Sequence, residues 1–117
     1  MNLSFKDREH IIKKFADEYN KSKIIELKGL DLLNEDIVSD SQECYIDTIN
    51  KYRYYYSLQN KIDRILEKLD WDTCCFIKRE FFTSNHRNDW WMNYYSRSTY
   101  YRLKKKSMEK FLGLLYD

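Results

Sequence analysis

Proline is absent from this chain of 117 residues, and glycine occurs only at Gly29 and Gly113. These residue types are the strongest breakers of helices, and they also dominate the tight turns between strands. A strand-based fold of this length needs many such turns, so their scarcity argues against it. The sequence therefore predicts an all-α fold, and the apolar pattern described below indicates about five helices.

Long hydrophobic runs, cysteine and histidine are also scarce. No apolar stretch approaches the roughly 18–20 residues that span a bilayer, and the charged start (residues 1–10) lacks the apolar region of a signal peptide. The three Cys and two His have the spacing of neither a zinc site nor a disulfide framework. We therefore expect a cytoplasmic protein with buried free thiols, no membrane contact, no metal and no cofactor.

Catalytic motifs are missing as well. The sequence contains no glycine-rich phosphate loop, no HExxH motif and no nucleophile with an obvious base beside it. His86 lies in a polar segment with Arg87 and Asp89, and it is the only candidate for acid–base chemistry. Because a single histidine in a loop is usually just exposed, we do not expect an enzyme.

Charge is present in quantity and is distributed unevenly. Residues 1–72 contain 12 basic and 15 acidic residues, whereas residues 73–117 contain 9 basic and 4 acidic residues. Such an asymmetry favours an anionic partner for the basic half, although a solvated helix face gives the same pattern. Residues 29–47 hold six acids and no Lys or Arg. We interpret them as an acidic connection laid on the domain, with a partner-docking strip as the alternative.

Apolar residues recur at spacings of three and four, as on one face of a helix. This pattern predicts helices at about 4–26, 42–69, 73–83 and 97–115, with a short helix at about 88–94. Expected boundary residues are Ser4, one of Ser39, Asp40 and Ser41, either Asp70 or Asp72, and Ser96 at helix starts, and Gly29 at the end of the first helix. We divide the chain into an amino-terminal part (1–40) and a helical domain (41–117).

The predicted helix at 73–83 has a simple apolar face. Cys74, Cys75, Ile77, Phe81 and Phe82 are expected to face inward. Lys78, Arg79 and Glu80 are expected to face water.

The final helix has two chemically different faces. At 100° per residue, one side carries Tyr100, Leu103, Ser107, Met108, Phe111, Leu114 and Leu115. The other side carries Ser98, Arg102, Lys105 and Glu109, flanked by Tyr101 and Lys106. Arginine can pair with a guanine edge, while hydroxyls, lysines and helix N-terminal amides hold phosphates. For Lys104, Lys105 and Lys106, the alternative is a merely solvated face.

A short helix, a tight turn and a longer helix with a polar start form the pattern of a helix-turn-helix, here at about 86–112. Arg87 precedes the short helix and is placed to contact phosphate. The segment "YSRSTYYRLKKKSMEKFL" resembles the recognition helix of phage late transcription regulators of the ArpU type and, more loosely, sigma-factor region 4. It also resembles a family of short mycoplasma proteins. Trp90 and Tyr94 depart from the pattern, which holds a small residue and a glycine there.

The resemblance implies a DNA-binding regulator of transcription or a sigma-like factor, with a recognition helix at about 97–112. Its partners would be double-stranded DNA and either RNA polymerase or a second copy of the chain. The expected DNA contacts are Arg87, Ser96, Arg97, Ser98, Thr99, Tyr101, Arg102, Lys105 and Lys106. The alternative is a helical protein–protein interaction protein that does not touch nucleic acid.

Two aromatic groups have competing interpretations. Trp90 and Trp91 are expected in the core, with stacking on unpaired bases as the alternative. Tyr52, Tyr54, Tyr55 and Tyr56, beside Lys51 and Arg53, fit an RNA- or partner-binding patch. A helix packed between neighbours explains these tyrosines more simply.

Overall fold

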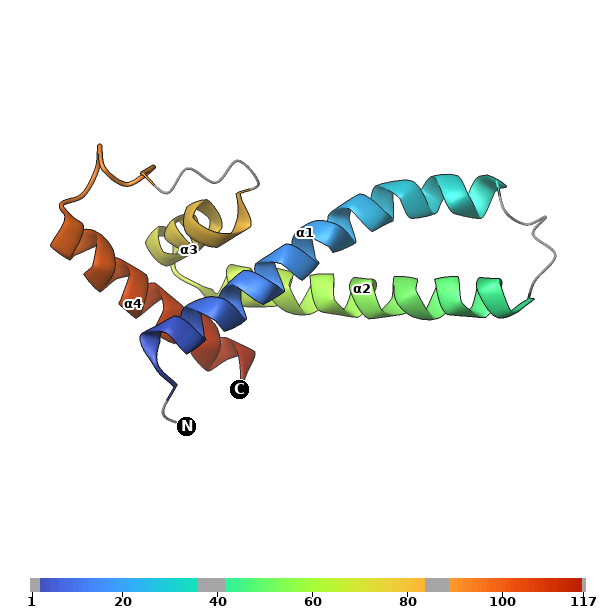
Figure 1. Cartoon of the computed structure of the whole chain (residues 1–117), viewed down its shortest axis with the longest axis horizontal. Helices are drawn as coiled ribbons and strands as arrows, with labels where there is room; N and C mark the ends of the chain where they lie inside the picture. The colour runs from blue at the N-terminus through green and yellow to red at the C-terminus, as the bar shows by residue number, and fades with distance from the viewer. Residues whose placement is uncertain (1–2, 36–41, 84–88, 117) are drawn as a thin grey trace.

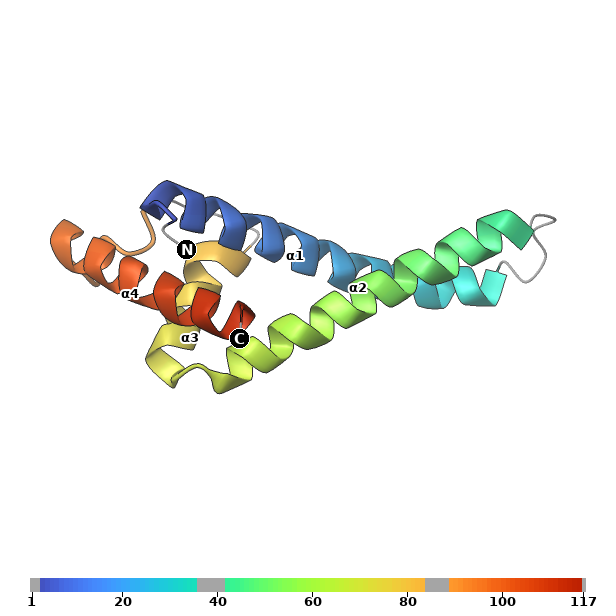
Figure 2. The same cartoon turned by 90° about the horizontal axis from the view of Figure 1, so that it is seen from below.

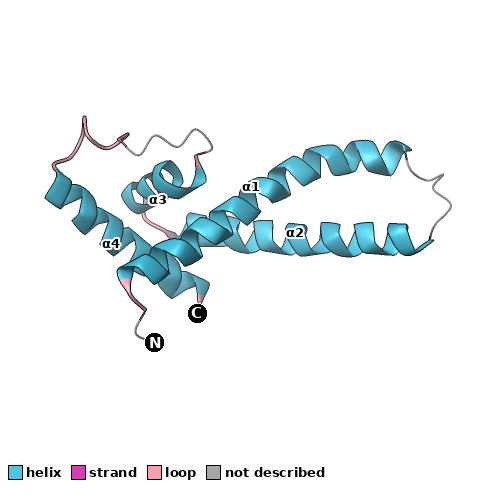
Figure 3. Ribbon diagram, viewed as in Figure 1, coloured by secondary structure: helices cyan, strands magenta, loops and turns pink. Residues whose placement is uncertain are grey.

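The computed structural model describes residues 3–35, 42–83 and 89–116, and for residues 26–35 and 42–49 it describes the backbone alone. These residues form four α-helices and one π-helical segment, without a strand (Figure 3), which confirms the all-α prediction. The elements are α1 (Phe5–Glu35), α2 (Gln42–Lys68), α3 (Trp71–Ile77), the π-helical segment η1 (Lys78–Phe82) and α4 (Arg97–Leu115).

Helices α1 and α2 run antiparallel and form an elongated hairpin (Figure 1). The molecule measures 58 × 32 × 23 Å, and the hairpin accounts for its length. Helices α3 and α4 lie at one end of this hairpin, and the first turns of α1 lie beside α4 in both views (Figure 2). We call the hairpin of α1 and α2 the arm, and we call α3, η1, residues 89–96 and α4 the head.

Helix α1 begins as predicted and ends later than predicted. The backbone N–H of Asp7 donates to Ser4 Oγ at 3.1 Å, which is an N-terminal cap. The helix continues through Gly29 to Glu35, so the prediction that Gly29 ends it is wrong. A glycine weakens a helix interior by about 1 kcal/mol relative to alanine, but it does not block the helical hydrogen bonds. The predicted caps Ser39, Asp40 and Ser41 lie outside the described residues.

One hydrophobic core joins the arm to the head. Ile12, Ile62, Ile77, Met108 and Phe111 have no exposed surface. They come from α1, α2, α3 and α4, so each of these helices contributes to one buried cluster. On α1, this cluster includes or contacts Phe5, Ile11, Ile12, Phe15 and Tyr19, whereas Ile24 is 53% exposed.

The arm also contains polar contacts between its two helices. Tyr19 Oη of α1 donates to Asp63 Oδ1 of α2 at 2.6 Å, and the buried Ser22 Oγ lies 3.5 Å from Gln59 Oε1 of α2. Within α1, Ser22 Oγ also donates to the carbonyl oxygen of Tyr19 at 2.6 Å. Tyr54 and Tyr56 are each 58% exposed. The interpretation of these tyrosines as packed between neighbouring helices is therefore wrong for Tyr54 and Tyr56. Tyr52 and Tyr55 are half-buried and line a hollow with Ser22 and Ile25 of α1.

Helix α3 begins with the expected cap at Asp70, whose carboxylate accepts from the backbone N–H of Thr73 at 3.2 Å. Lys110 donates to the same carboxylate at 2.9 Å and ties the last turns of α4 to this corner. The hydrogen bonds from Thr73 and from Lys110 hold the pKa of Asp70 below its ordinary value of 3.8.

Within the described residues, the cysteines are less buried than predicted, and neither a metal-binding cluster nor a membrane-spanning helix is found. Cys74 and Cys75 carry free thiols, and both are half-buried rather than fully buried. No three His, Cys, Asp or Glu side chains in the described ranges come together as metal ligands. No helix in this part of the chain is both long and apolar enough to cross a bilayer.

Candidate nucleic-acid interface

Helix α4 starts at the predicted residue with the predicted cap. Ser96 has extended backbone angles, and its Oγ accepts from the N–H of Thr99 at 3.3 Å. Ser96 Oγ also donates to Thr99 Oγ1 at 2.9 Å. Both hydroxyls are thus engaged in shaping the first turn, which is the capping role expected for serine at this position.

The inward face of α4 matches the predicted apolar stripe closely. Tyr100, Ser107, Met108, Phe111 and Leu115 are buried, and Leu103 and Leu114 are half-buried. Leu112 and Lys104 are also buried, although the sequence did not place them on this side. The stripe fixes the rotation of α4 about its axis, so the opposite side must face solvent.

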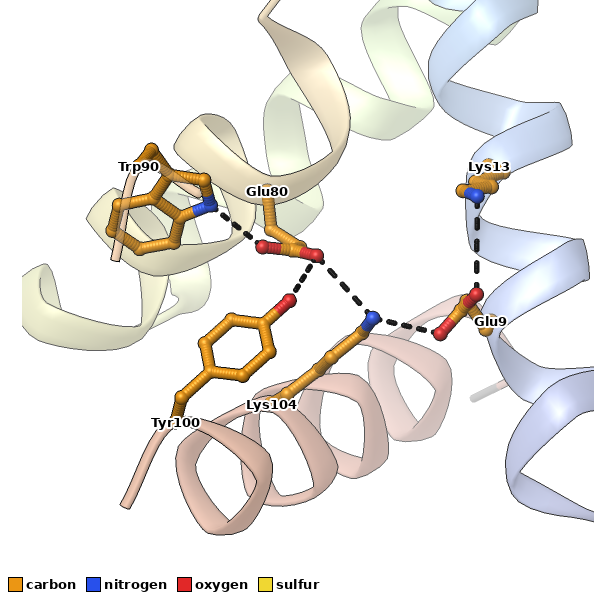
Figure 4. Close-up of polar contacts among 6 residues, drawn as sticks. All are labelled: Glu9, Lys13, Glu80, Trp90, Tyr100 and Lys104. Atoms are coloured by element: carbon orange, nitrogen blue, oxygen red, sulfur yellow. Dashed lines mark hydrogen bonds and ion pairs between the residues drawn. The ribbon is translucent and has the colours of Figure 1, made fainter. Parts of the chain in front are cut away.

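A buried carboxylate holds α4 in place (Figure 4). Glu80 is 6% exposed and receives three side chains. Trp90 Nε1 donates to it at 2.7 Å, Tyr100 Oη donates to it through a short hydrogen bond, and Lys104 Nζ lies 3.2 Å from it. We call Glu80, Trp90, Tyr100 and Lys104, together with Glu9, the anchor cluster. Burial of the phenol raises the pKa of Tyr100 above its ordinary value of 10.0, and the hydrogen bond to Glu80 raises this pKa further.

The prediction that Glu80 faces water is wrong. Glu80 follows the buried Phe76 by four residues and the buried Ile77 by three, so helical spacing places it on the inward face. The prediction assigned it to solvent because of its charge. The carboxylate is tolerated inside because an ammonium and two O–H or N–H donors surround it. Lys78 and Arg79 face solvent, as predicted.

Lys104 is likewise not part of a solvated lysine run. Its side chain is buried, and its Nζ bridges Glu80 at 3.2 Å and Glu9 Oε2 at 2.7 Å. Through this bridge α4 is connected to both η1 and α1. Only Lys105 and Lys106 of the three lysines remain available for an external ligand.

The outward face of α4 presents Ser98, Arg102, Lys105 and Lys106, all exposed. No ion pair connects these three cations to another side chain within the described ranges. Glu109 and Lys110 lie further along the helix and have partners in Arg8 at 3.2 Å and Asp70 at 2.9 Å. The predicted Ser98, Arg102, Lys105 and Lys106 therefore come together on one surface, which we call the α4 outer face.

The remaining predicted contacts lie around the first turn. Arg97 is exposed, and its guanidinium lies 5.9 Å from the ring centre of Tyr101, which is 44% exposed. Tyr101 also contacts Phe5 of α1, with ring centres 6.5 Å apart. Thr99 is half-buried and serves the cap. Arg87 lies outside the described residues.

The predicted short helix before α4 is not formed. Residues 89–94 are turns, so the prediction of a helix there is wrong for these positions. Trp90 donates to Glu80, and Trp91 stacks on Tyr100 with ring centres 4.4 Å apart. Trp90 and Trp91 both contact Tyr100 of α4, although they are adjacent in the sequence. Adjacent side chains of an α-helix point about 100° apart, so a short helix would not direct both rings to the same residue. Both tryptophans are half-buried, so their assignment to the core is confirmed in part.

Sequence reasoning missed the exposed side chains beside the anchor cluster. Arg79 places its guanidinium 5.5 Å from the ring centre of Tyr94 and 5.9 Å from that of Trp90. Tyr94 is 64% exposed. Arg79 and Tyr94 are fifteen positions apart and meet only in the folded chain, so no local pattern in the sequence indicates their contact.

Comparison of the chain with known protein families, with curated proteins and with solved structures gives no match.

Proposed function

We propose that the chain is a regulator of transcription that binds double-stranded DNA through the α4 outer face. The observation that carries this proposal is the charge of that face. Arg102, Lys105 and Lys106 are exposed and form no ion pair among the described residues. Glu109, four residues after Lys105 on α4, pairs with Arg8 at 3.2 Å, and Glu80 is buried and paired with Lys104. Cations without internal partners on a fixed helix can neutralise phosphates at little reorganisation cost.

The dimensions of α4 fit this role. An α-helix with its side chains is about 10–12 Å wide, and the DNA major groove is about 12 Å wide. Ser98 and Lys106 are separated by roughly 12 Å along the axis, at 1.5 Å per residue. A helix of this length can present Arg102 to base edges while the lysines contact phosphates, as recognition helices do.

The element that accompanies α4 on the DNA would differ from the first helix of the predicted helix-turn-helix, and residues 83–96 rather than a tight turn connect it to α4. In place of the short helix expected at 88–94, α3 together with η1 would lie across the DNA backbone. Lys78 and Arg79 are exposed on that element, and such residues suit phosphate contacts. The anchor cluster would hold this element and α4 at a constant angle.

A second candidate, docking of a protein partner, is favoured by the surface of the arm. Ile24 is 53% exposed, and Tyr54 and Tyr56 are each 58% exposed. One recognition helix offers few base contacts, so useful specificity requires a second DNA-contacting subunit. RNA polymerase or a second copy of the chain would meet this requirement, and an interaction protein without DNA binding would use the same surface.

The test compares two variants with the same change in net charge. Replacement of Arg102, Lys105 and Lys106 with Ala removes the cations of the α4 outer face. Replacement of Lys21, Lys51 and Lys61 with Ala removes three exposed cations from the arm. At fixed low salt, the first variant should lose about a thousandfold in affinity for duplex DNA, since each of the three lost charge-assisted contacts costs about 1.5 kcal/mol.

The arm variant should bind within about threefold of the native protein, because its lysines lie away from the proposed groove contact. Circular dichroism must show the same helix content for both variants. Equal losses of affinity in the two variants would show that net charge alone attracts the DNA, which contradicts binding through the α4 outer face. If the native protein does not bind duplex DNA, the proposal fails and docking of a protein partner by the arm is the candidate that stands.

A further inference from the structure

The turn at residues 89–94 exposes aromatic rings directly before α4. Tyr94 is 64% exposed, and Tyr95 is 37% exposed. The exposure does not reflect a loosely held backbone, because the N–H groups of Tyr94 and Tyr95 both donate to the carbonyl oxygen of Trp91 at 2.9 Å. The two rings are therefore presented to solvent by a hydrogen-bonded turn.

The turn is fastened to the head through its tryptophans. Trp90 packs edge-on against Phe76 with ring centres 5.4 Å apart, and it donates to Glu80. Trp91 stacks on the buried Tyr100. These contacts give Tyr94 a constant position relative to α4. A preorganised ring binds a flat ligand with less loss of conformational entropy than a mobile one.

Arg79 makes this surface selective for anions. Its guanidinium lies over the ring of Tyr94, 5.5 Å from the ring centre, and so covers one face of the phenol. Tyr94 is 64% exposed, so much of its surface is open to solvent, and the ring of Tyr95 lies beside it with ring centres 6.4 Å apart. Arg79 itself makes no ion pair within the described part of the chain, and its neighbour Glu80 points to Lys104 instead.

An exposed aromatic ring beside an unpaired guanidinium is the combination that binds an unpaired nucleobase. The base stacks on the ring, and the guanidinium contacts the adjoining phosphate. An apolar peptide would use the ring but leave the arginine without a partner, so the charge favours the nucleotide. Asp89 is the exposed acid of this turn, and it is outnumbered by Arg79 and Arg97.

We propose that Tyr94 and Arg79 form a stacking site for one unpaired DNA base next to the duplex held by α4. This inference rests on the proposed function and specifies its substrate as a junction between duplex and single strand. Ser96 and Arg97 follow the turn immediately, so Tyr94 adjoins the amino-terminal end of α4. An opened or frayed end of a duplex is such a junction.

The experiment measures binding of two DNA probes by the native protein. One probe is a blunt duplex, and the other is the same duplex with a short single-stranded extension carrying 2-aminopurine, whose fluorescence falls when it stacks. The extension should improve binding about tenfold, as expected for one stacked base, and the protein should quench the fluorescence of 2-aminopurine.

Tyr94→Ala should abolish both the gain and the quenching while leaving affinity for the blunt duplex unchanged. Tyr94→Phe should retain both effects, because the ring remains. Tyr116→Ala is the matched control, since Tyr116 is 63% exposed at the far end of α4, and it should behave as the native protein does.

Each other outcome separates this inference from the proposed function. Equal binding of the two probes by the native protein, or a gain that survives Tyr94→Ala, overturns the stacking site and leaves duplex binding intact. Binding of the extended probe without binding of the blunt duplex overturns the proposed function and supports the stacking site. Binding of neither probe overturns both.

Discussion

The arm and the head differ in where their acidic side chains lie. On α1, two lysines have partly exposed acidic partners on the same helix, with Lys13 3.8 Å from Glu9 and Lys21 3.9 Å from Glu18. In the head, the carboxylate of Glu80 is buried and taken by Lys104. Arg102, Lys105 and Lys106 of α4 form no ion pair within the described residues, whereas Lys110 pairs with Asp70 at 2.9 Å. The two regions differ in net charge as well, since residues 1–72 contain 12 basic and 15 acidic residues and residues 73–117 contain 9 basic and 4 acidic residues.

The two regions also differ in packing. In the arm, Ile12 and Ala16 of α1 are buried with the aliphatic residues of α2. In the head, rings and a charged hydrogen-bonded cluster fix α4 around Glu80. Apolar contacts of the arm tolerate small shifts, whereas a buried charge requires its partners at defined positions. Orientation of α4 should therefore depend on the anchor cluster more than on the arm.

The largest expected effect comes from the core that joins the two regions. Phe111→Ala should lower the free energy of unfolding by about 3–5 kcal/mol, because a fully buried ring is replaced by a cavity. Denaturant titration followed by circular dichroism measures this. Tyr116→Ala, on an exposed residue of the same region, should change stability by less than about 0.5 kcal/mol. Similar effects of the two substitutions would contradict a single shared core.

The second prediction concerns the anchor cluster itself. Glu80→Gln should destabilise the protein by about 2–3 kcal/mol, since Lys104 loses one of its two carboxylate partners inside the head. Glu67→Gln, on an exposed carboxylate of the arm, should have little effect.

A double-mutant cycle sharpens this prediction. Combining Glu80→Gln with Lys104→Met should cost less than the sum of the single substitutions, because no buried charge is then left without its partner. Additive effects would show that the two groups do not interact, and the anchor cluster would lose its central contact.

Alkaline pH should weaken the head through Tyr100. Its pKa is raised in the folded state, so its stabilising effect is fully present below the unfolded value of about 10 and is lost as pH rises above it. Tyr100→Phe should cost about 1 kcal/mol at pH 7 by removing the hydrogen bond to Glu80. It should also flatten the decline in stability measured between pH 9 and 11. An unchanged decline would exclude Tyr100 as its source.

The smallest expected effect is local to the first turn of α4. Ser96→Ala should lower stability by about 0.5–1 kcal/mol through loss of the cap. Hydrogen exchange should show faster opening of the first turn, with the arm unchanged. Ser57→Ala, within α2 and exposed, is the control and should be neutral. Faster exchange in the arm as well would mean that the two regions open together.

Local chemistry could be predicted from the sequence to a considerable extent. The start of α2 at Gln42, the cap at Ser96 and the division of α4 into an apolar and a basic face all follow from spacing and side-chain type. Ser98, Arg102 and Lys105 lie on the outer face because the stripe containing Met108 and Phe111 leaves them no other side. These features depend on residues within a few turns of one another.

The anchor cluster could not be predicted in this way. Lys104 is buried because Glu9 and Glu80, from two other elements, both reach it. Glu80 is tolerated inside because Trp90, Tyr100 and Lys104, from other segments, all reach it. The turn at 89–94 depends on tryptophans that contact partners elsewhere in the head. In each case the outcome is set by contacts between segments rather than by local periodicity.

The salt dependence of duplex binding tests the central claim most directly. Each phosphate that is neutralised contributes roughly 0.9 to the slope of log affinity against log salt concentration. The variant lacking Arg102, Lys105 and Lys106 should therefore have a slope shallower by about two to three than the native protein. The variant lacking Lys21, Lys51 and Lys61 should keep the native slope. Equal slopes in all three proteins would contradict the proposal that the α4 outer face holds the phosphates.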